Sequence, residues 1–94
     1  MQSKLNRDNY SVWTTLMKRV IGEKGLSSHI NGVTDPPSTS DTGYAKWEQW
    51  DNCCFNWIIN NIEANLVNEV SQYATARDLW KGLTITYGSG TDPF

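Results

Sequence analysis

The stretch from Tyr44 to Ile62 constrains this chain more than any other. It reads YAKWEQWDNCCFNWIINNI, contains no glycine or proline, and holds three of the five tryptophans. Apolar side chains recur in it at spacings of three and four residues, which predicts a helix. On a helical wheel one apolar stripe forms, and it consists of Tyr44, Trp47, Cys54, Ile58 and Ile62.

The apolar surface of this predicted helix is wider than one stripe. Phe55 and Ile59 extend it on one side, and Trp50, Cys53 and Trp57 extend it on the other. A surface helix needs an apolar arc of about 100° or a little more, and a helix that is apolar around most of its circumference is normally buried. The helix is therefore either the central rod of a small bundle or a rod with a partner on its spare side.

The size and charge of the chain exclude several classes of protein. Its 94 residues suit one small domain, which would bury about 60–65% of the surface of the unfolded chain. The net charge is −2 and the pI is near 5.1, whereas phosphate binding needs clustered lysines and arginines. No apolar run is long enough for a membrane span or a signal peptide. We therefore expect no direct nucleic-acid binding and no membrane partner.

The two cysteines, Cys53 and Cys54, are adjacent in the predicted helix. Neighbours on a helix point about 100° apart, so a disulfide between them has poor geometry. We interpret them as two small apolar residues in a reducing compartment, and the alternative is a bridge to a second chain through Cys53. The expected location is intracellular, in the cytoplasm.

A first amphipathic helix is predicted from Tyr10, with Asp8 or Asn9 as its N-cap and an end at Gly22 or Gly25. Its apolar face consists of Trp13, Leu16, Met17, Val20 and Ile21. Residues 1–8 are expected to form a flexible lead, 9–87 the helical domain, and 88–94 a linker or the start of a further segment. Asn31-Gly32 marks a turn, and 33–43 is a loop by composition.

Two further helices are predicted after the long one, which Asp41 or Thr42 would cap and which would end near Ile62. Residues 63–70 fit two turns. Thr75 and Asp78 match a capping box, which begins a last helix over 76–87. Its apolar face consists of Ala76, Leu79, Trp80, Leu83 and Tyr87, whereas Ile85 lies on the opposite face and should be exposed. The predicted fold is all-α, a small bundle of about four to five helices.

No pattern of catalytic residues is present. His29 is the only histidine, and its place beside a loop predicts a solvated side chain. Asp51 is the one carboxylate on the apolar stripe, so it would need a partner when buried, such as Arg19, Arg77 or a tryptophan N–H. The sequence contains no HExxH, CxxC, GxSxG or phosphate-binding glycine loop. We expect no catalytic residues, no metal ligands, no cofactor and no enzymatic activity.

Four segments in order resemble a known family. Residues 5–13 read LNRDNYSVW and resemble the LNGxNYxxW opening of the Gag polyprotein of Ty1/copia-type LTR retrotransposons, with Arg7 where the family usually has glycine. The resemblance continues through HING at 29–32, YAKW at 44–47 followed by Asp51, and TARDLWKGL at 75–83 followed by Tyr87. It covers about residues 5 to 87.

The resemblance implies the N-terminal, capsid-like lobe of Gag. In that family this part self-assembles into the shell of virus-like particles that package the element's RNA, and a zinc knuckle downstream binds the RNA. The matched positions coincide with the apolar faces and are interpreted as fold determinants. They are Tyr10, Trp13, Trp47, Leu79, Trp80, Leu83 and Tyr87.

Two functions follow from these patterns. The first is a structural self-association module, a Gag–Gag homo-oligomer, whose interface would be Trp50, Cys53 and Trp57, with Ile85 as a second spot. The alternative is a domesticated Gag-derived domain that binds a host protein through the same residues. In a third interpretation two flanking helices cover the three residues within one molecule, and no interface exists there.

Overall fold

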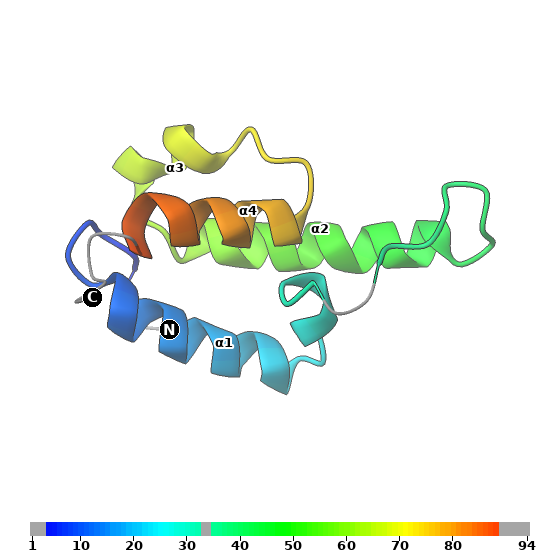
Figure 1. The fold of residues 1–94 in the computed structure, drawn as a ribbon, viewed down its shortest axis with the longest axis horizontal. Coiled ribbons are helices and arrows are strands. Elements are labelled where there is room, and N and C mark those ends of the chain that lie inside the picture. Colours follow the sequence, from blue (N-terminus) through cyan, green and yellow to red (C-terminus); the bar gives the residue numbers. More distant parts are fainter. Residues whose placement is uncertain (1–3, 33–34, 89–94) are drawn as a thin grey trace.

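The computed structural model describes residues 4–32 and 35–88. Within them the chain forms four α-helices: α1 (Tyr10–Glu23), α2 (Tyr44–Asn60), α3 (Ala64–Val70) and α4 (Ala76–Leu83) (Figure 1). A 3₁₀ turn, Ser27–His29, follows α1, and one π-helical turn, Thr84–Gly88, prolongs α4. None of the described residues forms a strand longer than an isolated bridge. The predicted all-α fold is confirmed.

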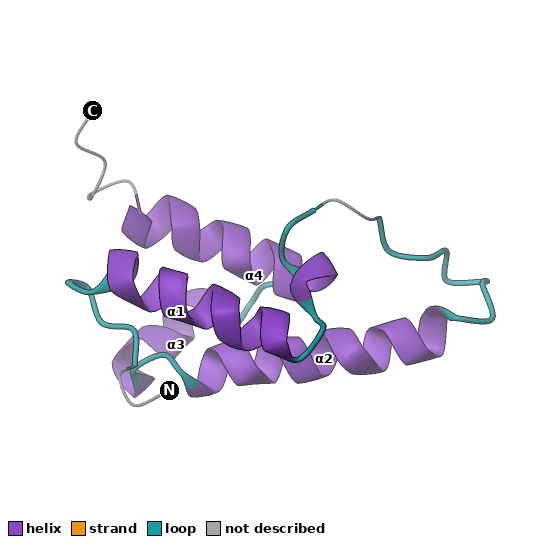
Figure 2. Ribbon diagram, turned by 90° about the horizontal axis from the view of Figure 1, so that it is seen from below, coloured by secondary structure: helices purple, strands orange, loops and turns teal. Residues whose placement is uncertain are grey.

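The helices are arranged around α2, the longest one. Figure 1 shows α4 beside α2, with α1 on one side of this pair and α3 on the other, and the perpendicular view of Figure 2 agrees. The first turns of α2 and the loop before it project beyond the other helices in both views. The C-terminal half of α2 is thus the central rod of the bundle, whereas its N-terminal end lacks a full set of neighbours.

The core lies where α1, α2 and α4 meet. Trp13 stacks on Trp80 with 5.8 Å between the ring centroids, and its indole N–H donates to the backbone carbonyl of Asn61 over 2.9 Å. This bond satisfies the polar atom of a tryptophan that is only 1% exposed. The other buried apolar residues of the three helices are Tyr10, Met17, Ile21, Cys54, Ile58, Ala76, Leu79 and Leu83.

The ends of the helices follow local sequence signals. Gly25 has a φ of +75°, its N–H donates to the carbonyl of Gly22, and the N–H of Leu26 donates to that of Ile21. This is a Schellman end, so α1 continues to Glu23 and Gly25 stops it. The hydroxyl of Thr75 accepts from the N–H of Asp78 over 3.1 Å, which confirms the predicted cap of α4.

The N-cap of α2 is Gly43, not Asp41 or Thr42 as predicted. The Asp41 carboxylate instead accepts from the N–H of Gly43 over 2.7 Å. It therefore shapes the turn that leads into the helix, and the helix begins one residue later than a cap at Thr42 would place it.

The prediction of a flexible lead over residues 1–8 is wrong for its second half. The Leu5 side chain is fully buried, its N–H donates to the carbonyl of Asn61, and its carbonyl accepts from the N–H of Glu63. Arg7, at the position where the resemblance would place glycine, forms an ion pair of 2.8 Å with Glu69 on α3. Residues 1–3 and 89–94 lie outside the described residues.

Candidate interaction surface

The three residues Trp50, Cys53 and Trp57, here called the α2 ridge, lie on one face of α2. Trp50 is 47% exposed, Cys53 is exposed, and Trp57 is half-buried. The interpretation that flanking helices cover the ridge is therefore wrong for its first two residues. Ile85 is 66% exposed, as its place opposite the apolar face of the last helix predicts.

A lysine borders the α2 ridge. The Lys24 ammonium lies 4.4 Å from the centre of the Trp57 ring, in cation–π geometry. Gly25 turns the chain at the end of α1, and a hollow beside this turn is lined by Lys24, Gly25, Leu26, His29 and Trp50. The ridge is therefore an apolar strip with a positive charge at its C-terminal end.

Of the seven core positions that the resemblance singles out, six are buried as predicted: Tyr10, Trp13, Leu79, Trp80, Leu83 and Tyr87. Trp47 is the exception, because it is only half-buried. It lies in the projecting part of α2, where it stacks on His29 with 5.5 Å between the ring centroids. The prediction that Trp47 joins the core is wrong because the bundle does not extend this far along α2.

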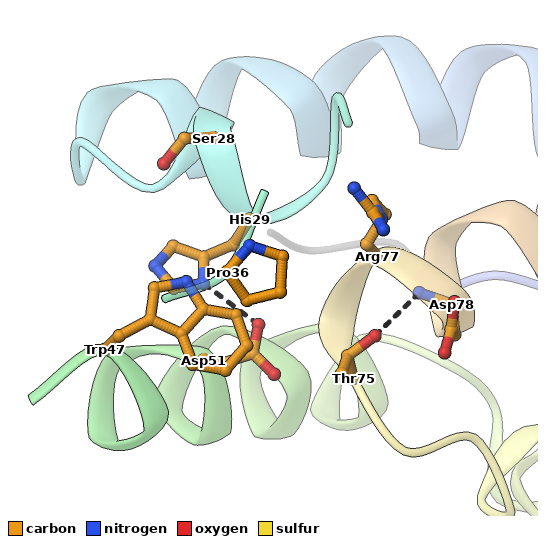
Figure 3. Close-up of a pocket in the computed structure, with 8 residues that line it drawn as sticks. All are labelled: Ser28, His29, Pro36, Trp47, Asp51, Thr75, Arg77 and Asp78. Atoms are coloured by element: carbon orange, nitrogen blue, oxygen red, sulfur yellow. Dashed lines mark hydrogen bonds and ion pairs between the residues drawn. The ribbon is translucent and has the colours of Figure 1, made fainter. Parts of the chain in front are cut away.

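Behind Trp47, a buried polar junction joins three elements (Figure 3). The Asp51 carboxylate on α2 lies 2.9 Å from the His29 ring nitrogen Nδ1, and its second oxygen accepts from the N–H of Ala76 at the start of α4. His29 is 8% exposed and Asp51 is 3% exposed. His29 is therefore not a solvated loop residue, and the partners of Asp51 are not the predicted arginines or a tryptophan.

The junction lines a cavity of about 90 Å³, together with Pro36, Thr75 and Arg77. A space of this size admits a few water molecules. The Thr75 hydroxyl beside it already accepts the capping bond of α4. His29 and Asp51 therefore have a structural role, because together they connect the 3₁₀ turn, α2 and α4.

The two cysteines have different environments. Burial, together with the nearby charges of Asp51 and Cys53, raises the pKa of the Cys54 thiol from 9.0 to about 12. Cys53 is exposed on the α2 ridge. Only Cys53 is thus available to a reagent or to a second molecule.

A second exposed apolar strip lies on α1. Val12 is 65% exposed and Leu16 is 45% exposed, although the sequence pattern placed Leu16 on the buried face. The buried residues of α1 are Tyr10, Trp13, Met17 and Ile21. This line is narrower than the predicted face, so Leu16 falls outside it. The spacing of Val12 and Leu16, four residues apart, is the signal that sequence reasoning missed.

Residues 4–32 and 35–88 contain no group of three or more histidine, cysteine, aspartate or glutamate side chains that could hold a metal ion. In the same residues no helix has the length and apolar character that a membrane span requires. Comparisons of the chain with protein-family models, with curated proteins and with solved structures find no match. Exposed apolar side chains on α1 and α2, namely Val12, Leu16 and Trp50, are the features of this surface that suit contact with another molecule.

Proposed function

We propose that this chain is a structural self-association module of a retrotransposon-type Gag, which contributes to the assembly of a virus-like capsid. The observation that carries the proposal is the α2 ridge, where Trp50 is 47% exposed on the folded domain. Contiguous exposed apolar surface marks interaction sites, and tryptophan is enriched among the residues that contribute most to binding. A ridge of two indoles and a thiol on a rigid helix suits contact with another folded surface.

The resemblance to Ty1/copia-type Gag supports the proposal from a separate direction. Six of its seven core positions form the interior of the domain, so the shared motifs serve to maintain the fold. The residues of the ridge are not among them. In such a protein the motifs would specify a common scaffold, and the surface would provide the contacts between copies.

The test is the mass of the chain in solution. We expect the parent to show concentration-dependent association, and the variant Trp50→Ala/Trp57→Ala to remain a monomer. A tryptophan at the centre of an interface contributes about 2 kcal/mol or more, which is about 30-fold in an equilibrium constant. The matched control is Asn52→Ala/Asn56→Ala, because both residues are exposed on the same helix and neither belongs to the ridge.

Circular dichroism would establish that each variant is folded. A folded Trp50→Ala/Trp57→Ala variant that associates like the parent would remove the ridge from the interface. A parent that stays monomeric up to millimolar concentration would contradict self-association by this domain and favour a host protein as its partner. A control variant that also loses association would show that the effect is not specific to the ridge.

A further inference from the structure

Two lysines border the α2 ridge. Lys46 lies one helical turn before Trp50, on the same face, and is exposed. At the other end of the ridge Lys24 covers the Trp57 ring. The remaining exposed polar neighbours on this face, Gln49 and Asn60, are uncharged. The ridge is thus an apolar strip with a cation at each end, on a chain whose net charge is −2.

The exposed strip of α1 has an acid near each end. Val12 and Leu16 lie at its centre, exposed Asp8 lies two residues before the helix, and exposed Glu23 is the last residue of the helix. Arg19 is on the same face, so the strip carries two acids and one cation. Asp8, Val12, Leu16 and Glu23 are here called the α1 stripe.

We propose that the α2 ridge of one molecule docks on the α1 stripe of a second copy, so that copies associate head to tail. This inference rests on the proposed self-association and specifies its geometry. The indoles of the ridge would cover Val12 and Leu16, and the two lysines would meet the two acids.

The dimensions of the two strips agree. At 1.5 Å per residue, Lys46 and Trp57 are about 16 Å apart along α2, and Tyr10 and Glu23, the ends of α1, are about 20 Å apart, with Asp8 two residues before Tyr10. The side chains of lysine, aspartate and glutamate span the difference. The apolar centre of each strip lies between its charged ends, so the ends pair whichever way the helices run.

A contact between two α2 ridges is disfavoured by the same charges. A two-fold axis that sets the helices antiparallel would place Lys46 of one molecule near Lys24 of the other, and no acid on either ridge would compensate. Like charges brought together at an interface weaken it and discriminate against that arrangement. A contact between two different surfaces leaves one free ridge and one free stripe at the ends of the assembly, so it generates chains or closed rings.

The decisive experiment mixes two variants that each lack one surface. Trp50→Ala/Trp57→Ala keeps only the α1 stripe, and Val12→Ser/Leu16→Ser keeps only the α2 ridge. We expect each variant alone to be a monomer, and an equimolar mixture to form a one-to-one complex of twice the monomer mass. Analytical ultracentrifugation measures both.

The outcomes separate this inference from the proposed function. If Val12→Ser/Leu16→Ser alone associates like the parent while Trp50→Ala/Trp57→Ala does not, the ridge self-associates and the head-to-tail contact is wrong. If the mixture stays monomeric although both variants are folded, the inference is also wrong. If the parent itself does not associate, the proposed function fails first.

A charge swap gives a second test that leaves every apolar residue in place. Lys24→Glu/Lys46→Glu and Asp8→Lys/Glu23→Lys should each associate about 3- to 10-fold more weakly than the parent, because each makes the two surfaces alike in charge. A mixture of the two variants should recover the affinity, since each ridge then meets a stripe of opposite charge. Equal affinity of all three samples would overturn the proposed pairing.

Discussion

Gly82 shows how a single missing side chain determines the packing of α4. A Cβ atom built at this position would collide with the Tyr73 ring, which packs directly against the backbone of the helix. The half-buried Tyr73 lies in the linker between α3 and α4. Glycine is unfavourable inside a helix by about 1 kcal/mol relative to alanine. Here the close packing of Tyr73 that the glycine permits offsets that cost.

We therefore predict that Gly82→Ala lowers the free energy of unfolding by about 1–2 kcal/mol, because Tyr73 must move off the helix. In the background Tyr73→Ala the same substitution should raise the stability by up to about 1 kcal/mol, since only the helix propensity then changes. Urea denaturation of the four proteins measures both values. A destabilisation that persists without the tyrosine would contradict this explanation.

The adjacent cysteines should differ in reactivity for a physical reason that is visible in their surroundings. The pKa of the Cys54 thiol is raised to about 12, so at pH 8 about one molecule in ten thousand carries its thiolate, against about one in ten for a pKa of 9.0. Exposed Cys53 has no such burial.

We predict that iodoacetamide at pH 8 modifies Cys53 in the native protein and leaves Cys54 unmodified until the chain unfolds. Mass spectrometry of the peptides identifies the site, and Cys53→Ser should abolish fast modification of the native protein. Raising the pH toward 12 should accelerate the reaction of Cys54 as its thiolate forms. Equal rates at the two thiols in the folded protein would show that Cys54 is not buried.

At the scale of elements, residues 5–8 act as a strap across the junction of α2 and α3. Leu5 is fully buried, and both of its backbone polar groups are bonded to residues of this junction. We predict that Leu5→Ala lowers the free energy of unfolding by about 2–4 kcal/mol through the cavity that it leaves. Exposed Lys4 supplies the control, because Lys4→Ala should change the stability by less than about 0.5 kcal/mol. Comparable effects of the two substitutions would show that residues 5–8 do not stabilise the fold through Leu5.

The sequence predicts well those helix ends that are determined by residues close together in the chain. The last helix begins just after Thr75 because the hydroxyl of this N-cap accepts from the N–H of Asp78, only three residues later in the sequence. The end of α1 at Gly25 has a similarly local origin, a positive φ that glycine tolerates. Periodicity then identifies the buried face of α4, because its four apolar positions, Ala76, Leu79, Trp80 and Leu83, are all buried.

The features that the sequence does not reveal depend on contacts between distant residues. His29 and Asp51 are 22 positions apart, and their pairing follows from how the 3₁₀ turn packs on α2. Leu5 is buried through bonds to residues near position 62, which a local pattern does not show. Trp47 has the spacing of a core residue, yet it lies in the first turn of α2, which projects beyond the other helices (Figure 1). Periodicity indicates which face of a helix is apolar. How far along the helix that face is covered depends on the tertiary arrangement of the other helices.

At the scale of the whole molecule, the arrangement leaves apolar surface exposed on two different helices. Trp50 on α2 and Val12 on α1 are each roughly half or more exposed, and two lysines border the first whereas two acids and Arg19 border the second. A chain with two complementary surfaces can bind one copy through each, which a single self-complementary patch does not allow. The assembly should therefore grow beyond a dimer as the protein concentration rises.

We predict that sedimentation velocity of the parent shows species larger than a dimer as the concentration rises, and that Trp50→Ala/Trp57→Ala shows none.

Raising the salt from about 0.05 to 0.5 M should weaken association several-fold, because the contacts of Lys24 and Lys46 with acids at the rim are then screened. It should not abolish association, since the indoles bury apolar area that salt does not screen. A parent that stops at a dimer at every concentration would indicate a two-fold contact. Association that is indifferent to salt would show that the lysines do not take part in it.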